Sequence, residues 1–363
     1  MAGTLNGFIN SQLIYSIIAK LRILSLAILS AALMLSACSK KTEQHEYTIF
    51  AFGTLIEITL YDVGQEKAKN IFTRLQQTFE KNHQDWSPWT EGDLAKLNRR
   101  LKNTDTEIKI PEHLLPIVKT SILLSEKSDG LFNPAIGELI NLWQFHKYQE
   151  SDIRPPDKAD IQRLLDQRPK MSDLKFSTQS SLLNSNPAVL LNFGAFAKGY
   201  AIEQSIRLLK DSGIDNAIIN AGGDLSVAGR HGDRAWNIGI RHPRKDEILA
   251  SLKVGDGESV FTSGDYERFY HYQGRRYHHI LDPRTGYPTR GTQSVTVLHD
   301  DAGVADAAAT ALFVAGPDDW QRVARNMGVR HVMLIDSDGN IQLTRTMQDR
   351  VKILDKTSSL SII

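Results

Sequence analysis

Apolar residues recur at helical spacing in several parts of the chain, and this periodicity predicts its main helices. In residues 65–82 the apolar positions lie three or four apart, on one helical face: Ala68, Ile71, Phe72, Leu75 and Phe79. We predict further helices over 111–127, 197–209 and 302–314. The last is rich in alanine and ends at Gly316-Pro317, a pair that stops helices.

Strict alternation of apolar and polar residues predicts the strands. Residues 47–61 alternate in this way, with Ile56, Ile58 and Leu60 on one face. Shorter strands are predicted over 189–193, 217–220, 236–240 and 294–298, and a hairpin over 331–335 and 341–344 that turns at Asp338-Gly339. Because strands and helices mix without a regular βαβ order, we predict an α+β fold.

The N-terminal segment has the order of a secretory signal. Lys20 and Arg22 precede a short apolar run over 23–35, and small residues follow. The run is too short for a confident membrane span. Leu35-Ser36-Ala37-Cys38 resembles a bacterial lipobox, in which Cys38 is acylated. We therefore expect a lipoprotein signal over 1–37, a lipidated Cys38 with a tether to 46, and a location in the bacterial cell envelope, facing the periplasm. An uncleaved anchor with an incidental cysteine remains the alternative.

Composition excludes several classes of chemistry. The chain has 43 Lys and Arg against 42 Asp and Glu, which gives no basic excess for nucleic acid. Cys38 is the only cysteine. If Cys38 is lipidated, the mature chain has no thiol for a disulfide, a thiolate metal site or a cysteine nucleophile.

The run from His278 to Pro288 holds the densest set of reactive side chains. Asp282-Pro283 and Thr285-Gly286-Tyr287-Pro288 cannot continue a helix or a central strand, so the chain turns there. A turn with two histidines, a carboxylate and a guanidinium is a candidate site, and a solvated hairpin loop is the alternative. A second loop-like run, 262–268, lies just before it.

Four further segments suggest a nucleotide ligand with a pyrophosphate. Lys198 stands near a helix start after small residues, and Gly222-Gly223 marks a sharp turn. Asp306 and Thr310 are four apart on a helix, where a carboxylate and a hydroxyl suit Mg²⁺ or Ca²⁺. Trp86 and Trp89 offer flat surfaces for a heteroaromatic ring. For each segment an ordinary structural role, such as packing, a plain turn or helix-dipole capping, stays open.

Taken in order, these motifs resemble those of the ApbE family, the FAD:protein FMN transferases. The resemblance covers residues 47–345 and leaves 346–363 as a C-terminal tail. The matching segments are Phe52-Gly53-Thr54, Trp86-Ser87-Pro88-Trp89, residues 129–134, 194–200, 222–224, 262–266 and 279–288, and Asp306 with Thr310.

The resemblance implies a single mixed α/β catalytic domain and a reaction. The enzyme binds FAD with Mg²⁺, a serine or threonine hydroxyl of an acceptor protein attacks the phosphorus on the FMN side, and AMP leaves. The implied acceptors are flavin-bearing subunits of membrane redox complexes. Two alternatives remain: an FAD pyrophosphatase that yields FMN and AMP, and a flavin-binding lipoprotein without turnover.

The resemblance also implies residue roles. Asp306, Thr310 and the backbone carbonyl of Ala195 would bind the metal. His279 would be the base, with Asp282 or Asp265 orienting it or sharing the role, and we expect His278 to be dispensable. The flavin-site positions are Phe52, Trp89, Leu131, Phe132, Asn133, Asn192 and Lys198. Asn133 and Asn192 stand where many members have aspartate, so FAD affinity is expected to differ.

Overall fold

The computed structural model describes residues 15–16, 18, 20–21, 43–145, 153–355 and 358–363. Cys38, the predicted lipidation site, lies outside these residues. Residues 44–363 form one compact unit. Among the described helices, none is both long and apolar enough to cross a membrane.

A nine-stranded sheet organises this unit. Its strands lie in the order β1-β2-β6-β7-β10-β13-β14-β15-β17. Neighbours are antiparallel except β15 and β17, which are parallel. The strands span Gln44–Ala51 (β1), Thr54–Tyr61 (β2), Asn216–Ala221 (β6), Asp224–Ala228 (β7), Ser259–Gly264 (β10), Thr292–His299 (β13), His331–Asp336 (β14), Ile341–Leu343 (β15) and Leu360–Ile362 (β17).

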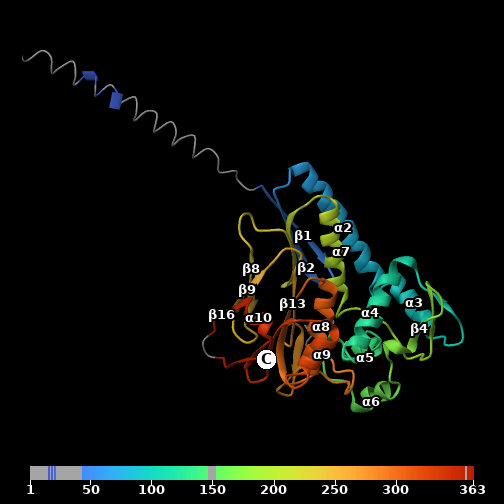
Figure 1. Cartoon of the computed structure of the whole chain (residues 1–363). Helices are drawn as coiled ribbons and strands as arrows, with labels where there is room; N and C mark the ends of the chain where they lie inside the picture. Colours follow the sequence, from blue (N-terminus) through green and yellow to red (C-terminus); the bar gives the residue numbers. More distant parts are fainter. Residues whose placement is uncertain (1–14, 17, 19, 22–42, 146–152, 356–357) are drawn as a thin grey trace, which may run out of the picture. The chain divides into compact units, whose positions relative to one another are not determined.

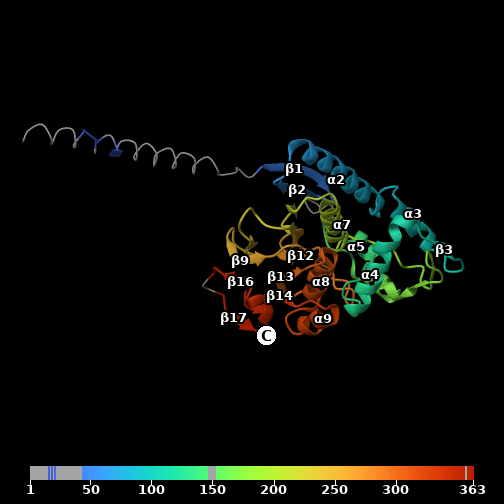
Figure 2. The same cartoon turned by 45° about the horizontal axis from the view of Figure 1, so that its top comes forward.

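The two faces of the sheet have different covers. Helices α2 (Gln65–Asp85), α7 (Ala197–Asp211) and α8 (Ala302–Ala315) cover one face, and a small sheet with the order β16-β9-β8 covers the other (Figures 1 and 2). Successive residues of β10 show the division, because Phe261 packs in the helical core and Val260 in the core under the small sheet. The remaining elements here are β8 (Trp236–Arg241), β9 (Ile248–Val254), β16 (Val351–Ile353), α9 (Trp320–Met327) and α10 (Arg345–Gln348).

Residues between α2 and α7 add a largely helical region beyond the helical layer (Figure 1). Its α-helices are α3 (Asp93–Leu101), α4 (Leu115–Lys127), α5 (Gly137–Trp143) and α6 (Lys158–Asp166), and two 3-10 helices are η1 (Glu112–Leu114) and η3 (Met171–Asp173). A small sheet joins β3 (Ile108–Lys109), β5 (Ser181–Asn184) and β4 (Leu174–Phe176). A separate hairpin, β11 (Phe269–Tyr272) and β12 (Arg275–His278), follows β10.

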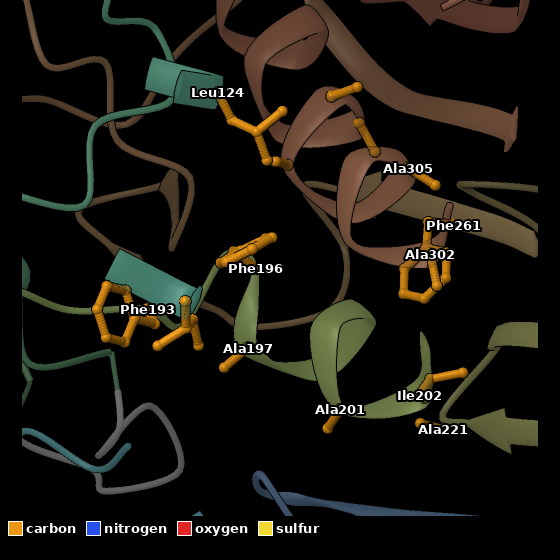
Figure 3. Close-up of a cluster of buried hydrophobic side chains, with 14 of the residues drawn as sticks. Leu124, Phe193, Phe196, Ala197, Ala201, Ile202, Ala221, Phe261, Ala302 and Ala305 are labelled. Carbon is orange, nitrogen blue, oxygen red and sulfur yellow. The ribbon is translucent and has the colours of Figure 1, made fainter. Parts of the chain in front are cut away.

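The contact between α7 and α8 is made by small residues. Ala197 and Ala201 on α7 and Ala302 and Ala305 on α8 are all buried, and Figure 3 shows them with Phe196 among the apolar side chains of this core. Alanine side chains add little thickness between two helices, so the backbones approach closely. This approach brings the start of α7, where Lys198 lies, next to α8.

Most elements predicted from periodicity are confirmed. The α+β class, the amphipathic α2 with its five buried apolar residues, the helices α4, α7 and α8, and the β14–β15 hairpin are all present. The strand predicted over 47–61 is instead the hairpin β1–β2. Phe52 and Gly53 both have positive φ, 52° and 76°, which makes a tight two-residue turn.

Three other predictions differ from the structure. Residues 189–193 are buried except for the half-buried Leu190, and they form one isolated bridge among the described residues, between Leu190 and Ile136. The loop-like run from 262 begins inside β10, whose last three residues are Thr262, Ser263 and Gly264. The residues set apart as a C-terminal tail join the domain, because β16 pairs with β9 and β17 with β15.

Candidate functional site

The start of α7 contacts α8 through a glycine. The backbone N–H of Gly199 donates a hydrogen bond of 2.8 Å to Oδ2 of Asp306. A Cβ at position 199 would lie 2.3 Å from the carbonyl oxygen of Ala302 and 2.6 Å from the Cβ of Asp306. Only glycine therefore allows this approach, which places the Asp306 carboxylate beside Lys198.

Lys198 is held by a carboxylate that sequence reasoning did not select. Its ammonium forms an ion pair with Oδ2 of Asp224, a buried residue at the start of β7. The other oxygen of Asp224 accepts a hydrogen bond of 2.7 Å from the backbone N–H of Thr262 on β10. Asp224 thus ties α7 to two strands. Its signal was present in the sequence, in the Gly222-Gly223-Asp224 motif.

Asp306 and Thr310 form the predicted pair on one face of α8. Asp306 is 7% exposed, and burial, with the charge of Asp224, raises the pKa of its carboxyl to about 6 although Lys198 acts in the opposite direction. One turn further, the hydroxyl of Thr310 lies 3.1 Å from the hydroxyl of Ser263 on β10. Ser263 is a third oxygen donor at this place.

The oxygen donors of this face fit a hard cation. Oδ1 of Asp306 accepts no hydrogen bond from any residue in the described part of the chain, and burial raises the pKa of this carboxyl even though Lys198 lies near it, so a bound cation would favour its charged form. Carboxylate and hydroxyl oxygens are ligands that Mg²⁺ and Ca²⁺ prefer. Ala195, the predicted carbonyl ligand, lies half-buried in the turn that leads into α7.

The imidazole of His279 lies near Lys198 and has one nitrogen without a partner among the described residues. Its Nδ1 is buried and has no hydrogen-bond partner among the described residues. Burial lowers the pKa of His279 to about 3, with the charges of Arg268, His278 and Lys198 acting in the same direction and a backbone hydrogen bond opposing them. The imidazole is therefore neutral at pH 7, with a lone pair available to accept a proton.

The two aspartates proposed to assist His279 are engaged elsewhere. Arg284 holds Asp282 through a fork, with Nε 2.9 Å from Oδ1 and Nη2 2.8 Å from Oδ2. Arg244 holds Asp265 in the same manner, at 2.7 and 2.6 Å. Neither carboxylate makes a hydrogen bond to His279 in the described structure. Both stabilise loops, so the expectation that one of them orients the base lacks a contact to support it.

His278, which we expected to be dispensable, has a structural role that this expectation did not include. It is buried, its Nε2 lies 2.8 Å from the carbonyl oxygen of Thr289, and its Nδ1 accepts a 3.3 Å hydrogen bond from the N–H of Ile280. The ring also meets Phe313 edge-on at 5.6 Å. Donating through Nε2 and accepting through Nδ1, His278 closes the turn that positions His279.

The aromatic positions divide into a buried and an exposed set. Phe52 packs half-buried at the β1–β2 turn and stacks on the buried Trp86, with ring centroids 6.0 Å apart. Trp89, three residues on, is 51% exposed. Leu131 and Phe132 are buried, and Phe132 meets Phe196 edge-on at 5.8 Å, so these two side chains belong to the core.

The two asparagines among the predicted flavin-site residues, Asn133 and Asn192, complete local turns. Oδ1 of Asn192 accepts from the N–H of Gly194 at 2.8 Å. Asn133 accepts from the N–H of Ala135 at 3.1 Å and donates to the carbonyl of Pro169 at 3.0 Å. That last bond needs an N–H₂ group, which an aspartate does not have.

A cavity of about 800 Å³ adjoins Asn133. It lies between α4, α5 and α6, and Pro283 and Arg284 of the histidine-bearing turn also line it. Of the predicted flavin-site residues it includes only Asn133. The structure therefore gathers Lys198, Asp306, Thr310 and His279 together, and places Asn133 at a neighbouring cavity.

Fold and site together define a class of mixed α/β enzyme. Its charged residues meet where α7 and α8 approach the ends of β7 and β10. The sequence profile of the ApbE family matches residues 52–334, and the chain belongs to that family. It is 39% identical over 308 residues to a FAD:protein FMN transferase from Rhodobacter capsulatus; the match covers 85% of this chain and 58% of that relative. It is 28% identical to one from Treponema pallidum, covering 88% of this chain and 92% of the relative.

Solved structures agree with this placement. The ApbE protein of Thermotoga maritima superposes with a TM-score of 0.76 at 31% identity, covering 85% of this chain and 99% of that one. A flavin transferase ApbE from Vibrio cholerae has the same fold, with a TM-score of 0.74 at 24% identity, covering 85% of this chain and 99% of that one.

Proposed function

We propose that this chain transfers FMN from FAD to a serine or threonine hydroxyl of an acceptor protein and releases AMP. The observation that carries the proposal is the neutral imidazole of His279, whose Nδ1 has no partner among the described residues, near the charged cluster of Lys198, Asp224 and Asp306. Phosphoryl transfer needs a proton acceptor next to groups that hold phosphates and neutralise their charge. The names of the relatives from Rhodobacter capsulatus and Treponema pallidum support the same reaction.

In this mechanism His279 takes the proton of the acceptor hydroxyl. The oxygen forms a bond to the phosphorus on the FMN side, and the bond from that phosphorus to the oxygen of AMP breaks. AMP leaves with the electron pair. The arrival of the negatively charged pyrophosphate raises the pKa of His279 from its value of about 3 in the free enzyme, which makes the imidazole a stronger base when substrate is bound.

The chain's own groups hold the substrate phosphates in place. Asp224 fixes the ammonium of Lys198, so the lysine is oriented before the substrate arrives. Asp306, Thr310 and the carbonyl of Ala195 would hold Mg²⁺, which would neutralise charge on the pyrophosphate. Phe52 and Trp89 would lie along the flavin ring.

We further propose that the protein is a lipoprotein that acts in the cell envelope. The charged, apolar and small-residue order before Cys38 supports a lipid anchor facing the periplasm. The acceptors would then be flavin-bearing subunits of membrane redox complexes, which present their hydroxyls at the same surface.

One experiment separates this function from its alternatives. Purified protein is incubated with FAD, Mg²⁺ and a flavin-acceptor domain, and both AMP and in-gel flavin fluorescence of the acceptor are measured. Equal amounts of AMP and covalent flavin are expected, and His279→Ala is the inactive control. AMP and free FMN without covalent flavin would identify a pyrophosphatase. Bound FAD with neither product would identify a flavin-binding protein.

A further inference from the structure

Arg268 is paired with His279 at the base of the β11–β12 hairpin. The carbonyl oxygen of Arg268 accepts a 3.0 Å hydrogen bond from the backbone N–H of His279. This pair directly follows the last ladder pair, Phe269 with His278. Residues opposite each other in an antiparallel pair project their side chains from the same face. The side chains of Arg268 and His279 therefore leave the hairpin on one side, away from the buried ring of His278.

The guanidinium of Arg268 reaches the turn that carries Phe52. A Cβ at Gly53 would lie 3.9 Å from Nη2 of Arg268, so the guanidinium lies over the β1–β2 turn. Its positive charge also opposes protonation of Lys198 and of His279. The group thus stands among the flavin-side turn, the lysine and the base.

Arg268 differs from Arg244 and Arg284 in having no ion pair with a described carboxylate. Arg244 and Arg284 each hold a carboxylate through two hydrogen bonds. The exposed guanidinium of Arg268 makes no hydrogen bond or ion pair with any residue that the structure describes. Its neighbour Glu267 is the nearest acid in sequence but forms no ion pair with it; burial raises the pKa of that carboxyl, although the charges of Arg241, Lys198 and Arg268 act in the opposite direction.

A guanidinium without a partner, next to a second cation, is a site for an anion. Lys198 is already neutralised by Asp224, so it brings little net charge to a ligand. An arginine offers five N–H donors in a fork that matches phosphate oxygens. A ligand with two phosphates would supply the negative charge that this place lacks.

We propose that Arg268 binds the pyrophosphate of FAD and stabilises the charge that develops on the phosphate of the leaving AMP. This inference rests on the proposed function. The bond from the acceptor oxygen to phosphorus forms, the bridging bond to AMP breaks, and the electron pair stays on the AMP phosphate, where the guanidinium donates to it. The proton goes to His279, and Arg268 keeps its own.

The test compares ligands with and without phosphates. Dissociation constants for FAD and for riboflavin are measured by flavin fluorescence with Mg²⁺ present, for the parent, Arg268→Ala and Arg268→Lys. Arg275→Ala is the matched control, because Arg275 lies exposed on the same hairpin and its guanidinium lies over the ring of Tyr277. Single-turnover release of AMP is followed in the same four proteins.

Arg268→Ala should weaken FAD binding roughly 10- to 100-fold, the range of a lost charge-assisted hydrogen bond, and leave riboflavin binding unchanged. AMP release at saturating FAD should slow as well. Arg268→Lys should recover part of both, since it restores charge without the fork. Arg275→Ala should match the parent.

Two results would overturn the proposal: FAD binding in Arg268→Ala equal to that in Arg275→Ala, or an equal loss of FAD and riboflavin binding, which would indicate a structural role. A parent that binds FAD but yields no AMP would contradict the proposed function alone. The comparison of FAD with riboflavin would still decide whether Arg268 holds the pyrophosphate.

Discussion

Gly199 donates its backbone N–H to the carboxylate of Asp306 over 2.8 Å, and this hydrogen bond joins the first turn of α7 to α8. The contact exists because position 199 has no side chain. It determines how far Lys198, the preceding residue, lies from the candidate metal ligands. The geometry of the site thus depends on a residue that has no chemistry of its own.

Gly199→Ala adds only one methyl group, but we expect it to disturb the site strongly. The added methyl would lie 2.3 Å from the backbone carbonyl of Ala302, which cannot rotate away, so the helices must separate. We expect a loss of about 1–3 kcal/mol in the free energy of unfolding, typical of overpacking, with weaker binding of Mg²⁺. Urea unfolding and Mg²⁺ titration measure both. Gly303→Ala is the comparison, because there the nearest atom is an aromatic edge of Phe196 at 3.0 Å. Equal stability of Gly199→Ala and the parent would contradict this account.

Asp306→Asn should raise stability while it abolishes metal-dependent transfer. The carboxyl has a pKa of about 6 in the fold against an ordinary value of 3.8, so its protonated form is favoured by folding. The stability that the protonated carboxyl adds to the fold is fully present below pH 3.8 and is lost as the pH rises through 6. Without metal, the amide should be more stable than the parent at pH 8, on the order of 1–3 kcal/mol, with the difference fading towards pH 4.

Addition of Mg²⁺ should reverse that order. The cation should stabilise the parent and not Asp306→Asn, and its apparent affinity for the parent should fall below pH 6 as the carboxyl is protonated. Thermal unfolding at pH 4, 6 and 8, with and without Mg²⁺, checks both parts. A folded Asp306→Asn protein that keeps the parent's Mg²⁺ dependence would rule out Asp306 as a ligand.

His279→Ala should slow flavin transfer about 10²–10⁴-fold, the usual contribution of a general base. FAD binding should stay close to that of the parent, because stacking and phosphate contacts do not involve the imidazole. Fluorescence gives the FAD affinity, and in-gel fluorescence gives the rate of covalent labelling. A transfer rate equal to the parent's would remove His279 from the mechanism.

His278→Ala should act through stability. It leaves the carbonyl of Thr289 and the N–H of Ile280 without their partners, which costs about 1–3 kcal/mol for buried groups. Thermal unfolding should show the loss, and transfer at a temperature where the variant is folded should be slowed less than in His279→Ala. A melting temperature equal to the parent's would contradict the structural role.

Cys38→Ala should release the protein from membranes or mislocalise it. The acyl chains that would hold the mature protein need the thiol of Cys38, and the chain has no second cysteine to replace it. Fractionation of cells into membrane and soluble material checks the result. If the variant partitions into membranes like the parent, lipidation at Cys38 is excluded as the anchor.

Periodicity in the sequence was enough to predict the helices that bury one face and leave the other exposed. The apolar stripe of α2 and the alanine-rich α8 both predict which residues pack, because a helix repeats its face every 3.6 residues. The turn at Phe52-Gly53 was missed for a local reason. Alternation continues through it on both sides, and only the positive φ of Phe52 and Gly53 breaks the strand; at Phe52 such a value is rare outside glycine.

The α+β class, the membership in a family and the kinds of reactive groups could all be read from the order of residues. Which of those groups meet depends on the packed domain. Lys198 pairs with Asp224, 26 residues away, and Arg244 takes Asp265, 21 residues away, so one aspartate becomes part of the site and the other does not. Periodicity reports how a segment faces the core, whereas an ion pair depends on where strand and helix ends lie after the sheet has formed. No short segment of the chain contains that placement.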